Sequence, residues 1–269
     1  MNAHPLLDVR NLGKHYAARN GHAPAWVIRD LTFSVNEGEL LTIVGPSGAG
    51  KTTLLNVLAQ IDAATTGDIR FDSELMPVGD DVALDPGHSC RVGYVTQDDN
   101  LLPWRTTIEN VLLPLEVQRT LTPETREHAH TLVRAVGLAG FEDYYPHELS
   151  GGMRKRAALI RTLVYDPPVI LMDEPFSAVD AETRTVLQED LLTLWELGRK
   201  TIVFVTHDIA EAIALGDRTL VLTHAPARIR SEHQIAMPRP RDIRDLAVNP
   251  VFRELYRAIR AEVQPACAI

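Results

Sequence analysis

The phosphate-loop pattern G-x-x-x-x-G-K-[ST] is matched by Gly45-Pro46-Ser47-Gly48-Ala49-Gly50-Lys51-Thr52. Glycines in such a loop let backbone N–H groups turn toward the β- and γ-phosphates of a nucleotide, and the following helix adds its positive end. Lys51 would bring a point charge to the phosphates, and the hydroxyl of Thr52 is suited to ligate Mg²⁺. The pattern therefore predicts a nucleoside triphosphate site, with Thr53 adjoining the loop.

Charged or titratable residues also close two later apolar runs. The run Val169–Met172 is followed by Asp173 and Glu174, and the run Thr201–Thr206 is followed by His207. An aspartate at a strand end beside a phosphate loop can orient hydrated Mg²⁺. Taken alone, the acidic pair is also typical of a plain strand-to-loop turn, and a histidine at a strand end is more often structural. Their occurrence together with a phosphate loop favours a functional interpretation of both.

A glycine-rich helix start lies between these two halves of the site. Leu149-Ser150-Gly151-Gly152-Met153 precedes a predicted helix over Arg154–Tyr165. A serine N-cap followed by two glycines leaves N–H groups exposed at a helix start, which makes a second anion site. These five residues by themselves equally fit an ordinary helix start without a ligand, and that alternative stays open at this point.

The elements that must position these residues alternate between strands and helices. Nearly continuous apolar runs predict strands of a parallel sheet covered on both faces: Leu40–Val44, Val92–Thr96, Val169–Asp173, Thr201–Thr206 and Thr219–Thr223. Leu6–Arg10 and Val27–Val35 alternate between polar and apolar residues, which predicts an antiparallel edge.

Helices carry their own start signals. Thr106, Thr122, Asp180 and Asp208 are predicted N-caps, for helices that end near Gln118, Gly137, Gly198 and Gly216 respectively. The tail contains Pro238-Arg239-Pro240-Arg241 and then a predicted helix from Asn249-Pro250. Its apolar face is formed by Phe252, Leu255, Tyr256, Ile259 and Val263.

Length and composition exclude several classes. A chain of 269 residues with 45% hydrophobic and 23% charged residues suits one globular domain, or one domain with an inserted lobe. The net charge of −9 argues against nucleic acid as the main partner. Cys90 and Cys267 lack metal-ligand spacing, so a reducing cytosol is expected. Neither a signal peptide nor an apolar stretch near the roughly 18 residues of a membrane span is evident, so any membrane role is expected to be peripheral.

With Thr206-His207-Asp208, the phosphate loop, glycine-rich segment and acidic strand end resemble an ATP-binding cassette (ABC) ATPase over nearly the whole chain. The resemblance implies an α/β fold: a P-loop NTPase (RecA-like) core with an antiparallel β edge and an inserted α-helical subdomain. It places the core at residues 1–97 and 166–225, the helical subdomain at 98–165 and a C-terminal extension at 226–269, with one ABC transporter domain over about 6–240.

The resemblance also assigns roles for ATP and Mg²⁺. Glu174 would be the catalytic base that polarises the attacking water, and His207 would contact the γ-phosphate and hold that water. Gln97 would touch Mg²⁺ together with Thr52 and Asp173. Tyr16 would stack on adenine, although a core tyrosine is the alternative. The segment Ser150-Gly151-Gly152 would complete the ATP site of a second copy, so that two chains sandwich two ATP molecules.

The sequence departs from the family pattern at three places. Lys155 stands where glutamine is common, and Val179, within the Ser177–Asp180 segment expected to cross the dimer interface, stands where leucine is usual. A small insertion over Ala17–Ala25 follows Tyr16 and bears on the placement of its ring.

Three further segments narrow the resemblance. Leu101-Leu102-Pro103-Trp104-Arg105-Thr106, the stretch Leu222–Ile229 and Met237–Arg241 are similar to the nitrate, sulfonate and taurine importer branch. This implies an ATPase at the cytoplasmic face of the membrane that powers uptake of a small anionic solute. Its partners would be two integral membrane permease subunits and, indirectly, an extracytoplasmic solute-binding protein, without nucleic acid.

Other classes remain as alternatives. An exporter ATPase shares the architecture and is disfavoured only by the branch segments. A soluble ABC ATPase acting on DNA or the ribosome is disfavoured because the stretch between Gln97 and Ser150 is too short for a long coiled coil or zinc module, and because the chain has a single cassette. A GTPase is disfavoured because no Asn-Lys-x-Asp motif is present.

Overall fold

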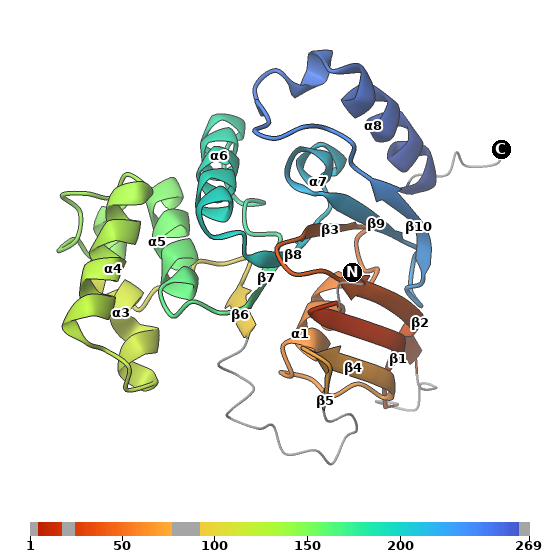
Figure 1. The fold of residues 1–269 in the computed structure, drawn as a ribbon, viewed down its shortest axis with the longest axis horizontal. Helices are drawn as coiled ribbons and strands as arrows, with labels where there is room; N and C mark the ends of the chain where they lie inside the picture. Colours follow the sequence, from red (N-terminus) through yellow and green to blue (C-terminus); the bar gives the residue numbers. More distant parts are fainter. Residues whose placement is uncertain (1–4, 18–24, 77–91, 264–269) are drawn as a thin grey trace. The chain divides into compact units, whose positions relative to one another are not determined.

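The computed structural model describes residues 5–17, 25–76 and 92–263, and the structural statements below concern these ranges. Cys90 and Cys267 lie outside them, as does most of the Ala17–Ala25 insertion. The described residues divide into two compact units, one within Met1–Ser89 and Lys200–Ile269 and the other within Cys90–Arg199. Figure 1 labels the helices and strands of both.

An antiparallel sheet forms one part of the first unit. Its order is β2-β1-β4-β5, with β1 at Leu7–Tyr16, β2 at Ala25–Val35, β4 at Thr66–Phe71 and β5 at Glu74–Met76. The β1–β2 pair confirms the predicted edge, but β1 runs on past Arg10 to Tyr16. Register shifts, with Asn11 at φ 49°, break the alternation there, so the sequence pattern did not reveal the extension. β4 and β5 were not predicted.

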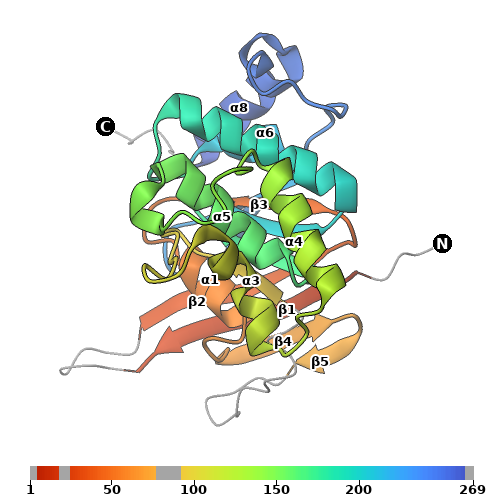
Figure 2. The ribbon, with the colours of Figure 1, turned by 90° about the vertical axis from the view of Figure 1, so that its left-hand side faces the viewer.

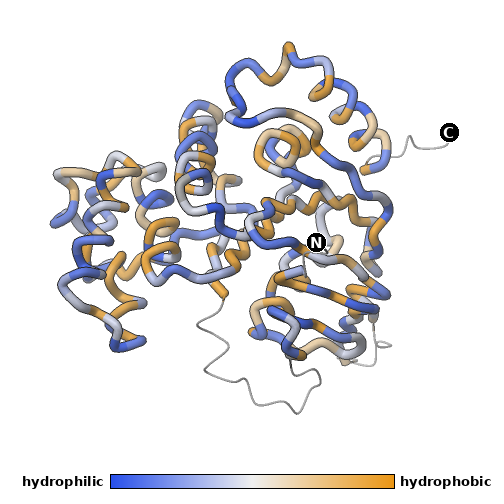
Figure 3. The backbone as a smooth tube through the Cα atoms, in the orientation of Figure 1, coloured by the Kyte–Doolittle hydropathy of each residue, from blue (hydrophilic) through white to orange (hydrophobic). Residues whose placement is uncertain are grey.

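A second set of strands in this unit is mainly parallel. The central strand β3 (Leu40–Val44) pairs in parallel with β8 (Thr201–Thr206) and β9 (Arg218–Leu222), while β10 (Ile229–Gln234) pairs antiparallel with β9. Every residue of β3, β8 and β9 is buried, as their apolar runs predicted. β10 is polar and was not predicted, and Figure 3 shows the contrast between an orange β3 and a largely blue β10.

Within the described residues, the first unit has three α-helices: α1 (Lys51–Leu58), α7 (Ile209–Leu215) and α8 (Pro250–Val263). The last is preceded by a short 3₁₀-helix, η2 (Leu246–Val248). The predicted apolar face of α8 is confirmed. Phe252 and Ile259 are buried in a cluster that includes Ile213 of α7, and partly buried members of the face, Leu255, Tyr256 and Val263, pack against it. The tail helix is thereby fixed to the unit that carries the phosphate loop.

The second unit combines two strands with a helical bundle. Strands β6 (Val92–Val95) and β7 (Val169–Asp173) pair in parallel. The helices are α3 (Thr107–Val117), α4 (Pro123–Ala135), α5 (Gly151–Leu163) and α6 (Ala181–Gly198), with a 3₁₀-helix η1 at Pro146–Glu148. α3, α4 and α5 pack side by side around a core that contains Val111, Leu115, Val133 and Ile160 (Figure 2).

The predicted N-caps are confirmed. Thr106 forms a capping box with Glu109, and Thr122 forms one with Thr125. The Asp180 carboxylate accepts a hydrogen bond from the Thr183 N–H at 3.0 Å. α5 begins at Gly151 rather than Arg154, because Ser150 is its N-cap and both glycines lie in its first turn. Among the residues that the structure describes, no helix combines the length and hydropathy needed to cross a membrane.

Candidate functional site

The phosphate loop joins the end of β3 to the start of α1. Gly48 and Gly50 have φ of 75° and 86°, in the left-handed region that favours glycine. A Cβ on Gly50 would lie 2.7 Å from Val27 Cγ1, so the loop approaches β2 too closely for any side chain there. The left-handed backbone at both positions, and the close approach to Val27 at Gly50, explain why both residues are glycine.

The charge predicted for the loop is held inside it. Lys51 is 6% exposed, and its Nζ donates to the carbonyl oxygens of Gly45 at 3.0 Å and Pro46 at 3.2 Å. Thr52 is exposed and Thr53 half-buried. α1 has no acidic residue in its first turn, so its positive end is not compensated by a carboxylate there. The backbone and Lys51 thus fit a phosphate group.

Tyr16 has an exposed ring in a fixed position. The residue is 45% exposed, which excludes the core-tyrosine alternative. Its hydroxyl donates to Asp62 Oδ2 at 2.6 Å, and Lys14 Nζ lies 2.7 Å from Asp62 Oδ1 and 5.0 Å from the centre of the Tyr16 ring. Partial burial and the hydrogen bond to Asp62 raise the pKa of Tyr16, so the phenol stays protonated and the contact persists.

His207 is exposed directly after β8, and its neighbours fix the backbone on both sides. Asp208 accepts hydrogen bonds from the N–H groups of Ala210 at 2.8 Å and Glu211 at 3.3 Å, as the predicted cap requires. The Glu211 side chain accepts a hydrogen bond from the Thr206 hydroxyl, whose oxygen also accepts from the Asp208 N–H at 3.0 Å.

Parallel pairing brings the phosphate loop and His207 to one edge of their sheet. Val44 of β3 is paired with Thr206 of β8, so the loop and His207 leave adjacent strand ends. In the second unit, Val95 of β6 is paired with Met172 of β7, so Gln97 and the Asp173–Glu174 pair also leave one edge. Each unit therefore gathers its own predicted residues as the strand pattern implied.

Asp173 and Glu174 differ in environment. Asp173 is 7% exposed at the end of β7. The pKa of the nearby Tyr94 is raised by the burial of the Tyr94 side chain and, to a lesser extent, by the negative charge of Asp173. Glu174 is half-buried and has φ 44°, a left-handed conformation that disfavours residues with a Cβ. Such strained residues cluster at functional sites, where the surrounding structure maintains them.

In the glycine-rich segment, Ser150 is the N-cap of α5, as predicted. The Ser150 Oγ accepts from the Met153 N–H at 3.3 Å, and α5 has no acidic residue in its first turn. A Cβ on Gly152 would lie 2.7 Å from Thr183 Cγ2 of α6, whereas a Cβ on Gly151 would have its nearest neighbour, Arg154 Nη2, at 4.0 Å. Gly152 is therefore needed for packing, and Gly151 is not.

Gln97 is exposed, and α5 holds the segment that contains it. Lys155 Nζ donates to the Gln97 carbonyl oxygen, and Arg154 Nε lies 3.0 Å from Asp99 Oδ2. Arg161 donates to the carbonyl oxygens of Asp99 at 2.8 Å and of Asn100 at 2.7 Å. Burial lowers the pKa of Lys155, an effect that the charges of Asp99 and Asp98 oppose.

Sequence reasoning missed the partners in these contacts. It flagged Lys155 only as a departure from the family, and it did not find Lys14, Asp62, Asp99 or Arg161. Each of these residues contacts a segment far away in the chain, so no local sequence pattern predicts the contact. The sequence offered one signal for these contacts. Arg154–Arg156 form a run of basic residues, and Asp98-Asp99 form an acidic pair that could interact with it.

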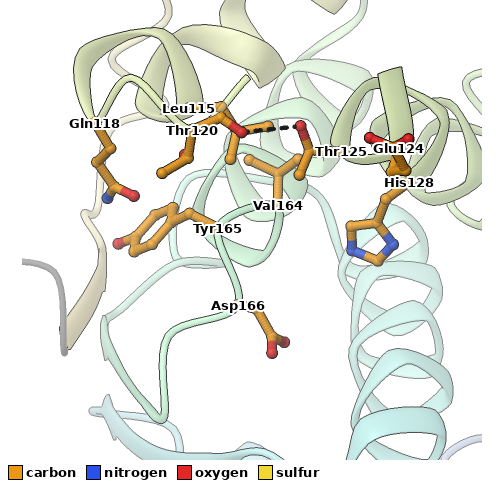
Figure 4. A pocket seen from close by; sticks show the side chains of 9 residues that line it. All are labelled: Leu115, Gln118, Thr120, Glu124, Thr125, His128, Val164, Tyr165 and Asp166. Carbon is orange, nitrogen blue, oxygen red and sulfur yellow. Dashed lines mark hydrogen bonds between the residues drawn. The ribbon is translucent and has the colours of Figure 1, made fainter. Parts of the chain in front are cut away.

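A groove of about 500 Å³ lies in the second unit between the end of α3, the start of α4 and the end of α5 (Figure 4). Leu115 and Val164 line it together with polar residues. Its charged lining residues, Glu124 and Asp166, are acidic, and neither lysine nor arginine belongs to the lining, which consists of Leu115, Gln118, Thr120, Glu124, Thr125, His128, Val164, Tyr165 and Asp166.

Comparison with known proteins identifies the family. Residues 28–177 match the family model described as ABC transporter. The chain is 41% identical to an uncharacterized ABC transporter ATP-binding protein of Methanocaldococcus jannaschii, over 96% of this chain and 92% of the relative. It is 36% identical to the aliphatic sulfonates import ATP-binding protein SsuB of Bacillus cereus, over 87% and 88%. It is 40% identical to SsuB 2 of Burkholderia cenocepacia, over 90% and 83%.

A solved structure agrees. The ATP-binding cassette MJ0796, a dimer in a post-hydrolysis state bound to ADP and Pi, matches with a TM-score of 0.73 and 31% identity, over 86% of this chain and 100% of that one. This chain therefore belongs to the ABC transporter family and is an ATP-binding, ATP-hydrolysing cassette. The expected α/β cassette fold is confirmed, and the similarity to sulfonate import proteins agrees with the importer branch.

The close approach of α5 to α6 yields a prediction on stability. Gly152→Ala should lower the free energy of unfolding by about 1–3 kcal/mol, because the new methyl overlaps Thr183 Cγ2. Thr183→Ser, which removes that methyl and keeps the hydroxyl bonded to Asp180, should restore most of the loss. Chemical denaturation measures both, with Gly151→Ala as the control. Equal losses for the two glycine variants would contradict the packing role.

Proposed function

We propose that this chain is the ATPase subunit of an importer, which powers uptake of a small anionic solute of the nitrate, sulfonate or taurine kind through separate membrane subunits. The observation that carries the proposal is the similarity, over more than four fifths of both chains, to proteins named for aliphatic sulfonates import. The chain would act at the cytoplasmic face of the membrane, with an extracytoplasmic solute-binding protein as an indirect partner. Within it, residues 98–165 would be the helical subdomain and residues 1–97 and 166–225 the core.

In this proposal the first unit binds the nucleotide. Backbone N–H groups of Gly45–Thr53 and the Lys51 ammonium hold the phosphates, and the exposed Tyr16 ring stacks on adenine, kept in place by Asp62. Thr52, Gln97 and Asp173 would hold Mg²⁺, in keeping with the preference of this ion for one or two protein oxygens together with phosphates. When bound, Mg²⁺ neutralises the charge that develops on the phosphates.

Glu174 and His207 would act on the water. The Glu174 carboxylate would accept a hydrogen bond from the attacking water and take its proton as the bond to the γ-phosphorus forms. The bond from the γ-phosphorus to the bridging oxygen breaks in the same step, so that ADP and phosphate are left. Glu174 directly follows the buried Asp173, and its left-handed backbone fixes the position from which its side chain extends. His207, held between β8 and the Asp208 cap, orients the same water and contacts the γ-phosphate.

We expect Glu174→Gln to bind ATP normally and to lose most turnover. The amide keeps the shape of the side chain but cannot take a proton, so kcat should fall about 100-fold or more while the Kd for ATP changes little. Steady-state hydrolysis and equilibrium binding measure the two quantities. Glu182→Gln, at an exposed position on α6, is the control. Hydrolysis by Glu174→Gln near the wild-type rate would exclude Glu174 as the base.

We further propose that two copies close over two ATP molecules. The α5 start, with its Ser150 cap and uncompensated positive end, would contact the γ-phosphate bound by the other copy, and the Ser177–Asp180 segment would cross the interface. The dimeric state of the cassette MJ0796 supports this arrangement.

Addition of ATP to Glu174→Gln should accordingly produce a dimer, because the nucleotide stays bound and unhydrolysed. Ser150→Arg in that background should prevent it, since a bulky side chain at the helix start obstructs the phosphate. Light scattering with and without ATP measures the molecular mass. Thr131→Arg, on the exposed side of α4, should still dimerise. A Ser150→Arg protein that dimerises with unchanged affinity would overturn the sandwich model.

The second unit offers two features for a membrane subunit. Trp104 is 71% exposed, in a loop that Asn110 fixes through hydrogen bonds to Leu102, Arg105 and Thr106. The acidic groove between α3, α4 and α5 complements a helix that carries basic residues. We propose that the Gln97–Thr107 loop and this groove receive a cytoplasmic helix of the permease, since large aromatic side chains anchor interfaces.

Trp104→Ala should leave the isolated subunit as stable as the wild type and able to bind ATP, because the ring makes little contact within its own chain. It should weaken co-purification with the permease about tenfold or more, as expected for an anchoring aromatic. Val248→Ala, at a residue 73% exposed, is the matched control and should not affect co-purification. A much lower melting temperature of Trp104→Ala alone would instead assign Trp104 to the core.

A further inference from the structure

The arginines of Pro238-Arg239-Pro240-Arg241 cap the C-terminal end of α7. Arg241 Nη1 donates to the carbonyl oxygens of Ile213 at 3.1 Å, Ala214 at 3.0 Å and Gly216 at 2.6 Å. Arg239 Nη2 donates to the carbonyl oxygen of Leu215 at 2.5 Å. The last carbonyl groups of a helix have no partner within it, and these two side chains supply the partners.

The contact is buried and charged. The Arg241 side chain is 2% exposed. Burial lowers its pKa to about 10, an effect that the charge of Arg239 reinforces and that of Asp217 opposes, so the guanidinium remains protonated at neutral pH. A cation at the negative end of a helix is favourable, and here solvent does not screen it.

The same cluster reaches the strand that enters the phosphate loop. Arg239 Nε donates to Asp217 Oδ1 at 2.9 Å, and Asp217 Oδ2 accepts from the Leu40 N–H at 2.9 Å, at the first residue of β3. One tail segment is thereby bonded to the end of α7 and, through Asp217, to the start of β3.

At its other end α7 begins with the cap Asp208, the residue after His207. The helix has only seven residues, Ile209–Leu215, and the last five are buried. Glu211, one turn in, is bonded to Thr206, so His207 lies between a fixed strand end and a fixed helix. A shift of α7 along its axis would therefore move the backbone of His207.

We propose that Arg241, assisted by Arg239, is a positioning residue for ATP hydrolysis that acts through α7 on His207. This inference rests on the proposed role of His207. The loss of Arg241 lets α7 shift, so the imidazole no longer meets the γ-phosphate and the attacking water, while the Lys51 loop still binds ATP.

A double-mutant cycle in the full chain tests this, with single-turnover ATP hydrolysis as the readout. Arg241→Met should slow hydrolysis about tenfold in the wild-type background and less than about twofold in the His207→Ala background, because its effect passes through His207. ATP affinity should change less than about twofold. Arg218→Met is the matched control: this buried arginine of the same unit bonds Glu39 and Glu232 and belongs to β9. It should leave the single-turnover rate unchanged.

Equal losses from Arg241→Met in both backgrounds would overturn the inference, and so would an equal loss from Arg218→Met. If Arg241→Met does not fold, Arg241→Lys carries the same cycle, since it keeps the charge with fewer donors. A wild-type rate for His207→Ala would overturn both the role of His207 and this inference. A slow His207→Ala protein with additive Arg241 loss would overturn the inference alone.

Discussion

The pairing of β3 with β8 and β9 is the constraint on which the nucleotide-binding unit depends. All three strands are buried over their whole length, so a shift of one residue in register would force each side chain into a differently shaped space. The observed register sets Val44 against Thr206 and Val221. The residues that follow these strands therefore lie at one edge of the sheet without long loops, because the strand register places them there.

The starts of the helices divide according to charge. α3, α4, α6 and α7 each have a glutamate in the first turn, which stabilises their positive ends. α1 and α5, the two helices assigned to phosphate, have none. α8 also lacks one; there Asn249 accepts from the Val251 N–H at 2.9 Å, as Ser150 accepts from the Met153 N–H at the start of α5. An anionic ligand would stabilise the positive ends of α1 and α5, as the first-turn glutamate does in α3, α4, α6 and α7.

Local patterns predicted the parts of the fold that local physics controls. The buried strands and the caps Thr106, Thr122 and Asp180 follow from hydropathy and from hydrogen-bonding side chains near their own backbone. β4, β5 and β10 were missed, because short or polar strands are specified by the partner strand rather than by their own sequence. The extension of β1 was hidden by the irregular backbone at Asn11.

The candidate site shows the same division. The phosphate-loop pattern located Lys51, and the ends of apolar strands located Asp173, Glu174 and His207. The residues that hold the site residues in place could not be found in this way. Asp62 beside Tyr16 and Lys155 beside Gln97 are joined to them only by the folded chain. Lys155 departs from the family pattern, in which glutamine is common. Only its contact with the Gln97 carbonyl oxygen gives that residue a physical role.

The left-handed backbone at Glu174 has a consequence for how this protein responds to selection. A side chain in that conformation costs the folded state about 1 kcal/mol that glycine would not cost. Selection for thermal robustness alone therefore favours replacement of the very carboxylate assigned to the chemistry. Thermostable variants of this cassette should be sought at other positions, because a change at Glu174 would remove the carboxylate proposed as the base.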